Sequence, residues 1–306
     1  MSDNKNKPSE LCDNRPKVGS VAVVGVPNAG KSTLVNTILG AKLSIVSKKA
    51  QTTRHKVLGI YSDEQRQIKF LDTPGFQLKY KSVLNSAMNK SVSSSITEVD
   101  IVIFVIEAGL IDDGEIDLIK MLPKDIPVLC AISKIDRLPS KNALLPFIEA
   151  LKERFKFADI IPTSAHKKLG LDVLLTVISD YLPTGVPDVS PDEFTDRPER
   201  FFAAEIVREK VFHLMGEEIP YGITVEIEKF NTVEGLRKID ATIVVSKSAY
   251  KGMIIGAQGA KLKSIGTKAR VDMEKLFEGK VFLRLWVKVR KGWVDDSQSV
   301  KYFGYE

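Results

Sequence analysis

The sequence predicts an α/β fold in which a doubly wound domain with a mostly parallel sheet precedes a smaller α+β domain. Short apolar runs alternate with helical patterns through residues 18–182, as expected of strands that helices cover on both faces. Beyond residue 200 the order changes to a helix, two strands, two helices and a last strand. The length of 306 residues also suits two domains better than one.

The first domain is expected to contain five strands with helices between them. Several of the runs are apolar throughout, which is typical of parallel strands that are buried on both faces. A covering helix is indicated over residues 143–155, where Leu144, Ile148, Leu151 and Phe155 recur at helical spacing. The predicted strands are residues 18–24, 67–71, 101–106, 128–132 and 160–161.

Two segments outside the domains differ from them in composition. Residues 1–17 are polar and lack an apolar signal-peptide core, which predicts a loose tail and a cytoplasmic protein. Residues 183–200 combine four prolines with acidic side chains, which is typical of an interdomain linker. The first domain is therefore predicted over residues 18–182 and the second over residues 201–306.

The elements of the second domain follow from periodicity and turn signals. Residues 199–215 follow a helical pattern, and two strands are expected over residues 222–230 and 237–246. Two further helices flank the glycines of residues 256–259. Residues 281–290 alternate between aliphatic side chains and aromatic or cationic ones, as in a strand with one buried face.

The composition excludes several classes of protein. The chain is 43% hydrophobic and 27% charged, as in an ordinary globular protein. Its longest apolar run, residues 101–106, is far shorter than the ~20 residues that span a bilayer. Cys12 lies in the polar tail and Cys130 in an apolar strand, so a disulfide and a zinc site are not expected.

Residues 25–32 read Gly-Val-Pro-Asn-Ala-Gly-Lys-Ser, between the apolar run 21–24 and a helical pattern at 33–39. The glycines let backbone N–H groups converge, and the following helix adds its positive N-terminal end, so this setting predicts a polyphosphate site. Lys31 is expected to reach the β- and γ-phosphates, and Ser32 to ligate Mg²⁺. The residues predicted around the phosphates are Gly25, Val26, Pro27, Asn28, Ala29, Gly30, Lys31, Ser32 and Thr33.

A second motif, Asp72-Thr73-Pro74-Gly75, follows the predicted strand 67–71. Because the carboxyl ends of parallel strands meet at one edge of a sheet, Asp72 is expected beside the phosphate loop as an indirect Mg²⁺ ligand. The Gly75 N–H can bond the γ-phosphate. The residues predicted to meet the nucleotide here are Asp72, Thr73, Pro74, Gly75 and Phe76.

A third motif, Ser133-Lys134-Ile135-Asp136, predicts the base. Asp136 can accept hydrogen bonds from N1–H and the 2-amino group of guanine, a pairing that adenine cannot make. Lys134 can lay its stem over the ring, and Ser164 and Ala165 follow the next strand, where a backbone N–H can reach the guanine O6. The sequence therefore predicts GTP and GDP as ligands, held at the base by Ser133, Lys134, Asp136, Ser164 and Ala165.

These motifs resemble the translation-factor branch of GTPases, where the base motif usually begins with Asn rather than with Ser133. The resemblance implies that Thr53, directly before Arg54, is a second Mg²⁺ ligand. It also implies slow intrinsic hydrolysis, because Phe76 stands where Ras-type enzymes carry a water-orienting Gln. GTPases with this Pro-Asn pair often use the Asn to hold K⁺, a role expected of Asn28. The residues expected to act in catalysis are Lys31, Thr53, Gly75 and Asn28.

Residues 253–266 resemble the GxxG helix–loop–helix of a KH domain. Two glycines with small or polar residues between them let a nucleic-acid backbone approach closely, and KH domains clamp about four nucleotides there. The motif lies within residues 247–291, where 12 Lys and Arg oppose 3 Asp and Glu, an excess of +9. The order of predicted elements is that of a type II KH domain. The residues expected to contact RNA are Ile255, Gly256, Ala257, Gln258, Gly259, Lys261 and Lys263.

A P-loop GTPase joined by an acidic linker to a type II KH domain resembles the Era family of GTPases. The likeness covers residues 18–306. It implies binding near the 3′ end of 16S ribosomal RNA, a role in assembly of the 30S subunit, peripheral contact with the inner membrane and a monomeric state. The most distinctive matching strings are residues 28–33, 51–55, 195–197 and 285–289, with Gly292 and Trp293.

Two alternatives to a hydrolysing switch are considered. Ser133 and Phe76 also suit an RNA-binding module whose nucleotide domain is a sensor with negligible turnover, and phosphate release would separate the two hypotheses. A tRNA-modifying GTPase would need a further catalytic domain or a catalytic cysteine. The chain has no room for the former, and Cys130 lies in an apolar strand, so this alternative is not favoured.

Overall fold

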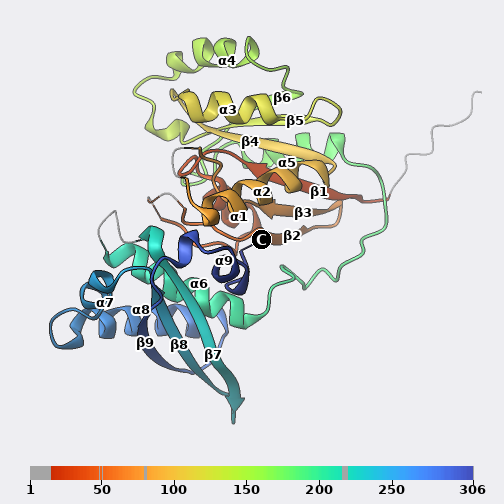
Figure 1. Cartoon of the computed structure of the whole chain (residues 1–306). Coiled ribbons are helices and arrows are strands. Elements are labelled where there is room, and N and C mark those ends of the chain that lie inside the picture. Colours follow the sequence, from red (N-terminus) through yellow and green to blue (C-terminus); the bar gives the residue numbers. More distant parts are fainter. Residues whose placement is uncertain (1–14, 48, 50, 79–80, 216–219, 306) are drawn as a thin grey trace, which may run out of the picture.

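The computed structural model describes residues 15–305 except 48, 50, 79–80 and 216–219, and it places two sheets side by side (Figure 1). The larger sheet has six strands in the order β2-β3-β1-β4-β5-β6, and only the β2-β3 pair is antiparallel. This confirms the mostly parallel sheet and adds the edge strand β2, which was not predicted. The strands are β1 (Lys17–Val24), β2 (Val57–Ser62), β3 (Arg66–Asp72), β4 (Ile101–Glu107), β5 (Val128–Ser133) and β6 (Asp159–Pro162).

Helices cover this sheet on both faces, which confirms the doubly wound prediction. Strand β1 shows why, because Val21 and Val23 face one core cluster while Ala22 and Val24 face the other. The first cluster contains side chains of α1 and α5, and the second contains side chains of α2, α3 and α4. These helices are α1 (Lys31–Leu39), α2 (Val83–Thr97), α3 (Asp113–Met121), α4 (Leu144–Lys152) and α5 (Leu171–Tyr181).

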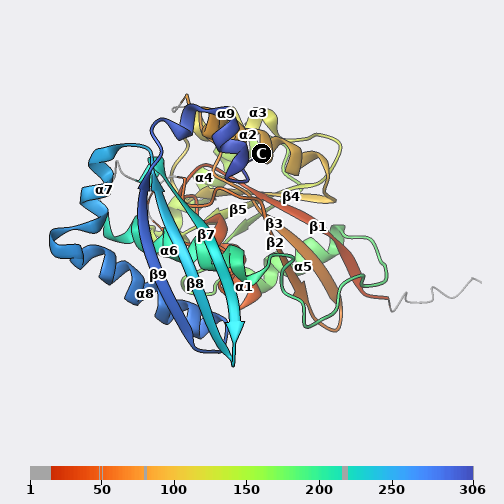
Figure 2. The same cartoon turned by 60° about the horizontal axis from the view of Figure 1, so that its bottom comes forward.

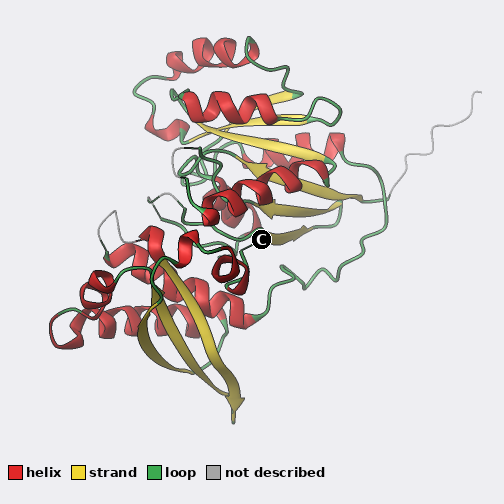
Figure 3. Ribbon diagram, viewed as in Figure 1, coloured by secondary structure: helices red, strands yellow, loops and turns green. Residues whose placement is uncertain are grey.

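The smaller sheet has the order β7-β8-β9, with β7 antiparallel and β9 parallel to β8. Helices α6 and α8 pack on one of its faces (Figures 2 and 3). The predicted order of elements is confirmed, and a short terminal helix α9 is added. The elements are α6 (Glu199–Leu214), β7 (Ile223–Val233), β8 (Leu236–Val245), α7 (Ser248–Ile255), α8 (Ala260–Leu276), β9 (Val281–Val289) and α9 (Ser297–Tyr302).

The predicted linker is bound along the edge of the larger sheet. The Ile60 N–H donates to the carbonyl of Phe194 at 2.9 Å, and the Thr195 hydroxyl donates to the carbonyl of Leu58 at 2.7 Å. Phe194 and Thr195 therefore bond backbone groups on the outer edge of β2, which would otherwise be free to pair with another chain. Helix α6 begins at Glu199, within the last two residues of the predicted linker.

A separate apolar cluster joins the two domains. Leu84 and Met88 of α2 pack with Trp293, Val300 and Tyr305 near the C-terminus. Trp293 is completely buried, and its indole N–H donates to a backbone carbonyl at 3.1 Å. The domains therefore share a core in this structure. Among the helices of the described residues we find none whose length and hydropathy would suit a membrane span.

Candidate nucleotide and RNA sites

The phosphate loop joins β1 to α1 at the carboxyl edge of the larger sheet. Gly30 has φ +104°, a left-handed conformation that favours glycine. Gly75 comes so close to this loop that a Cβ atom would lie 2.7 Å from the backbone of Pro27. Any larger residue at position 75 would therefore push the two loops apart. Both positions explain why glycine is required where the sequence places it.

Lys31 points back into the phosphate loop. Its Nζ donates to the carbonyls of Gly25 and Val26, each at 3.0 Å. Burial lowers the pKa of Lys31 to about 8, although the Asp72 carboxylate acts in the opposite direction. A polyphosphate would offer this ammonium stronger acceptors than two neutral carbonyls, so the predicted role of Lys31 fits its position.

The predicted Mg²⁺ ligands gather beside Lys31. The hydroxyls of Ser32 and Thr53 lie 2.8 Å apart. Asp72 is fully buried, and neither of its carboxylate oxygens has a hydrogen-bond partner among the described residues. Burial raises the pKa of Asp72, against the effect of the nearby Ser44, Ser32 and Lys31 side chains. An orphaned carboxylate beside two hydroxyls is an all-oxygen set, which suits Mg²⁺.

The side chains of Thr73 and Phe76, from the second motif, are buried away from the pocket. The Thr73 hydroxyl donates to the carbonyl of Val23 at 2.8 Å. The Phe76 ring is buried in the core, while its N–H donates to the carbonyl of Gly25 at 3.2 Å. The phenyl ring therefore holds the segment in place and leaves no polar side chain at position 76 to orient a water molecule. Pro74 lies between them, and Gly75 lines the pocket.

Most of the residues predicted to bind the base line a cavity of about 390 Å³. Asp136 accepts a hydrogen bond from the Ser164 hydroxyl at 2.5 Å, which lowers the pKa of this carboxyl. Asp136 is thereby held ionised, as guanine recognition requires. Ser133 and Ala165 line the same cavity. The Ser133 hydroxyl donates to the carbonyl of Ala29 at 2.5 Å, so Ser133 supports the phosphate loop through one hydrogen bond.

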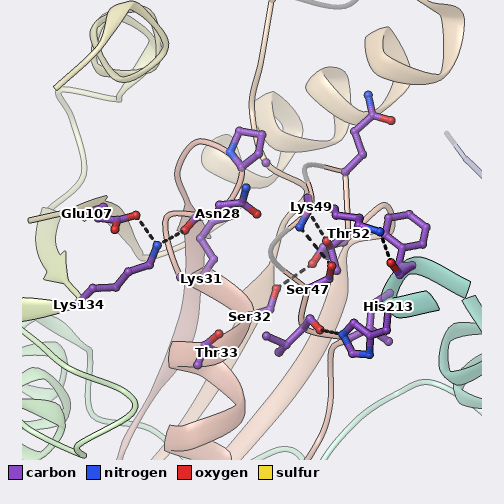
Figure 4. A pocket seen from close by; sticks show the side chains of 18 of the residues that line it. Asn28, Lys31, Ser32, Thr33, Ser47, Lys49, Thr52, Glu107, Lys134 and His213 are labelled. Carbon is purple, nitrogen blue, oxygen red and sulfur yellow. Dashed lines mark hydrogen bonds and ion pairs between the residues drawn. The ribbon is translucent and has the colours of Figure 1, made fainter. Parts of the chain in front are cut away.

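Lys134 links the base and phosphate ends of the site. Its Nζ donates to the carbonyl of Asn28 at 2.7 Å and forms an ion pair with Glu107 at the end of β4 (Figure 4). Glu107 was not identified from the sequence, because a single acidic residue after an apolar strand carries no motif. These contacts fix the end of a side chain that lines both cavities, and the predicted contact of Lys134 with a base remains a prediction.

The phosphate pocket extends to the second domain, which sequence patterns could not predict. A cavity of about 870 Å³ is lined by the phosphate loop, by residues of the segment 45–53, and by Phe212 and His213 of α6. Figure 4 shows His213 on the opposite side of this pocket from Lys134. The His213 imidazole makes a 3.0 Å contact with the carbonyl of Val46. The pocket thus lies between the two domains.

Residues 40–56, which we call the switch segment, carry several charged contacts to the second domain. Lys49 donates to the carbonyls of Phe212 and Met215, at the C-terminal end of α6, where a cation is stabilised by the helix dipole. Lys42 donates to Glu209 at 2.7 Å and to Asp272 at 3.2 Å. These contacts hold the C-terminal halves of α6 and α8 against the segment that bears Thr53.

Arg54 makes the deepest of these contacts. Its guanidinium donates to the carbonyls of Ile223 at 2.6 Å and Tyr221 at 3.3 Å. It also lies within 6.0 Å of the ring centroids of Phe212, Trp293 and Tyr305. Arg54 is almost fully buried. A side chain next to the predicted Mg²⁺ ligand Thr53 is therefore enclosed by the other domain.

The predicted RNA-binding turn is exposed between α7 and α8. Gly256, Gln258 and Gly259 all have positive φ, and Ala257 and Gln258 are exposed at the tip. Lys261 projects into solvent on the first turn of α8, and Ile255 ends α7. The turn therefore presents its backbone to an approaching strand, as the GxxG motif requires.

A groove of about 390 Å³ continues from this turn between α8 and β9. Gly266 forms part of its wall, where a Cβ atom would come within 3.4 Å of Leu285. Of the residues predicted to contact RNA, Gly259 and Lys263 line this groove. The sequence did not identify the other lining residues, which are Leu262, Gly266, Thr267, Arg270, Leu283 and Leu285. Leu262, Leu283 and Leu285 also pack against the core of the domain, so their apolar character alone does not indicate a groove.

Fold and site together define a P-loop GTPase that carries a KH domain. A family model described as "50S ribosome-binding GTPase" matches residues 20–134, and a KH domain model matches residues 218–294. The chain is 50% identical over 290 residues to GTPase Era of Nitrosomonas eutropha, which covers 95% of this chain and 98% of that protein. It therefore belongs to the Era family of GTPases. GTPase Era of Actinobacillus pleuropneumoniae serotype 5b is 44% identical over 307 residues, or 100% of this chain and 99% of that one.

Two solved structures share the whole architecture. A variant of Aquifex aeolicus Era bound to GDP and AlF4⁻ is 40% identical, with a TM-score of 0.90, and covers 94% of this chain and 99% of that one. Era in complex with MgGDPNP and nucleotides 1506–1542 of 16S ribosomal RNA is 39% identical, with a TM-score of 0.92, over 95% of this chain and 99% of that one. Family membership identifies this protein as a GTPase, which confirms the hydrolysing enzyme rather than the sensor with negligible turnover.

Proposed function

We propose that this protein is a GTP-controlled switch that binds 16S ribosomal RNA near its 3′ end and acts in assembly of the 30S subunit. The related Era structure with MgGDPNP and nucleotides 1506–1542 of 16S ribosomal RNA supports this RNA target. The exposed GxxG turn and its groove supply the surface, and Lys261 and Lys263 supply the positive charge at the turn.

One observation supports the proposed nucleotide-dependent switch. Thr53 lies beside Ser32 in the nucleotide pocket, while the adjacent Arg54 is enclosed by the second domain. Moving Thr53 toward Mg²⁺ and the γ-phosphate would pull on Arg54 and on Lys49, which holds the C-terminal end of α6. A nucleotide-dependent change in the switch segment therefore has a direct route to the RNA-binding domain.

The chemistry proposed for the site follows from its polar groups. Mg²⁺ bound to Ser32 and Thr53, with Asp72 behind them, would neutralise charge that develops on the β- and γ-phosphates. Lys31 and the Gly75 N–H would hold the γ-phosphate. With the Phe76 ring in the core, we propose that Asn28 holds K⁺ near the bond that breaks, and that the intrinsic rate is slow.

The location of the protein is also a proposal. The resemblance to Era GTPases supports a cytoplasmic monomer that associates with ribosomal subunits and makes peripheral contact with the inner membrane. The stretch 247–291, with its excess of +9, supplies a surface that would be attracted to either polyanion.

The RNA assignment is tested with a variant in which Ala257 and Gln258 are both replaced by Asp. Two carboxylates at the exposed tip would repel the phosphate backbone and close access to the turn. Single-stranded RNA from the 3′ end of 16S ribosomal RNA is titrated at fixed salt against a scrambled strand, and GTP affinity is measured alongside. We expect loss of nearly all sequence preference with unchanged GTP affinity. A double variant that keeps the preference would contradict the assignment.

A further inference from the structure

The sheet of the second domain has one face that α6 and α8 do not cover (Figure 2). Along β9, Leu283, Leu285 and Val287 pack toward the core, so the alternate residues point to the opposite side. We call this opposite side the outer face. Its exposed β9 residues are Phe282, Arg284, Trp286 and Lys288.

Two aromatic rings stand on the outer face at a regular spacing. Phe282 is 50% exposed and Trp286 is 43% exposed, which leaves much of each ring open to solvent. They are four residues apart on one strand, or roughly 13 Å. Arg284 lies between them, held by Asp240 through two hydrogen bonds of 2.7 and 2.6 Å, with its guanidinium 5.4 Å from the centroid of Trp286. Asp240 therefore holds the Arg284 guanidinium beside the Trp286 ring.

Cations accompany these rings along the strand. Lys238 on β8 is in register with Phe282, and Lys288 follows Trp286 on the same face. Edge strands often carry cations that prevent pairing with other chains, but that role does not account for two half-exposed rings among them. Flat rings alternating with cations are typical of surfaces that bind single-stranded nucleic acid, where bases stack and phosphates are neutralised. A double helix would not offer its base faces to such rings.

The outer face meets the GxxG groove along β9. Leu283 and Leu285 line the groove from the inner side of this strand, while Phe282 and Trp286 project from its other side. Among the strands that the structure describes, β9 pairs with β8 alone, so none of them lies beyond β9 between the two surfaces. A strand of RNA leaving the groove would need only to turn around this edge to reach the aromatic rings.

We propose that the outer face is a second RNA-binding surface, on which Phe282 and Trp286 stack bases of the same strand that the GxxG groove holds. The inference rests on the proposed RNA-binding function. It extends the RNA contact beyond the four or so nucleotides of a KH groove. It also gives a role to Trp286, which neither the nucleotide site nor the GxxG groove uses.

The test compares three RNAs: a short strand that fills the groove, and the same strand lengthened at its 5′ or its 3′ end. For the parent protein, one of the two extensions should increase the affinity. Replacing Phe282 and Trp286 together by Ala should lower the affinity for that extended RNA about ten-fold. The affinity for the short strand should stay within about two-fold of the parent. The Trp286→Phe variant should keep the gain, because a ring remains. Binding of the short strand serves as the control for folding.

Fluorescence gives an independent readout. Trp293 is fully buried, so quenching on addition of RNA would report on the exposed Trp286, and the Trp286→Phe variant should lose that signal. If the double Ala variant and the parent bind the longer RNA with equal affinity, the proposal is overturned. That result is expected if the outer face binds a protein partner instead. A parent that binds the short strand but gains nothing from either extension overturns it as well. A parent that binds none of the three RNAs overturns the proposed function itself.

Discussion

The guanidinium of Arg54 lies 6.0 Å from the ring centroid of Trp293, although the two residues belong to different domains. The same guanidinium donates to the Ile223 carbonyl, and the residue before it, Thr53, contacts Ser32 in the nucleotide pocket. A single peptide bond thus separates a predicted Mg²⁺ ligand from the core of the interdomain contact. Binding at one site can bias the other through a contiguous set of contacts.

The first prediction concerns Arg54→Ala. The change removes a buried cation and leaves the carbonyls of Ile223 and Tyr221 without this donor, at a cost of about 1 to 3 kcal/mol for each such group. We expect GTP to bind as in the parent, while the effect of nucleotide on RNA affinity shrinks to less than about two-fold. Arg154→Ala is the matched control, because Arg154 is exposed and donates within its own helical turn. An unchanged nucleotide effect in Arg54→Ala would exclude this route.

The second prediction concerns the base. Asp136→Asn replaces an acceptor pair by an amide, which can donate to the C2 oxygen of xanthine but no longer pairs with both guanine donors. The Ser164 hydroxyl, now 2.5 Å from the carboxylate, can still bond the amide oxygen. GTP affinity should fall and xanthosine triphosphate should become the preferred ligand. Competition binding measures both, and retention of tight GTP binding would refute the assignment of Asp136.

The third prediction concerns a monovalent cation. The Phe76 ring lies in the core and Asn28 lines the phosphate pocket, so hydrolysis should be faster in K⁺ than in Na⁺ at equal ionic strength. Asn28→Ala should remove most of this difference. Multiple-turnover phosphate release is the measurement, with nucleotide affinity as the control. Identical rates of the parent protein in both salts would rule out the cation.

The fourth prediction concerns acid stability. Burial lowers the pKa of His55 to about 4, and the ring stacks on Tyr305 at 4.6 Å between centroids. Below its ordinary pKa of 6.5, the unfolded chain takes up a proton that the folded protein does not. The contribution of His55 to stability is therefore complete above pH 6.5 and is lost as the pH falls toward 4, by roughly 3 kcal/mol in all.

Urea unfolding at pH 7 and pH 4.5 tests this, with His55→Phe as the comparison because its ring can stack without titrating. The free energy of unfolding should fall more steeply between the two pH values in the parent than in the variant. Equal falls would mean that His55 does not contribute.

The sequence predicted the parts of the protein that depend on local patterns. Apolar runs predicted the buried strands. The motifs of residues 25–32 and 256–259 were predicted to lie on loops before helices, and the structure places them there. Strand β2 escaped prediction because Gly59 interrupts a short edge strand with only one paired neighbour. The position of β2 in the sheet depends on its antiparallel pairing with β3, and the local sequence pattern of residues 57–62 does not indicate that pairing.

The interdomain half of the nucleotide pocket could not be predicted for a similar reason. His213 and Val46 meet across 167 positions of the chain, and Arg54 and Ile223 across 169. In the sequence, Arg54 resembles any surface cation of a polar loop. Its burial becomes visible only when the aromatic residues that surround it, from three separate parts of the second domain, are brought together by folding.

The most direct test of the central claim, that nucleotide state controls RNA binding, is a titration with labelled RNA from the 3′ end of 16S ribosomal RNA. The protein is saturated either with a non-hydrolysable GTP analogue or with GDP, at one salt concentration. We predict at least about five-fold tighter RNA binding with the analogue than with GDP. Because coupling is reciprocal, RNA should raise the ratio of analogue affinity to GDP affinity by the same factor. Equal RNA affinity in the two nucleotide states would contradict the account.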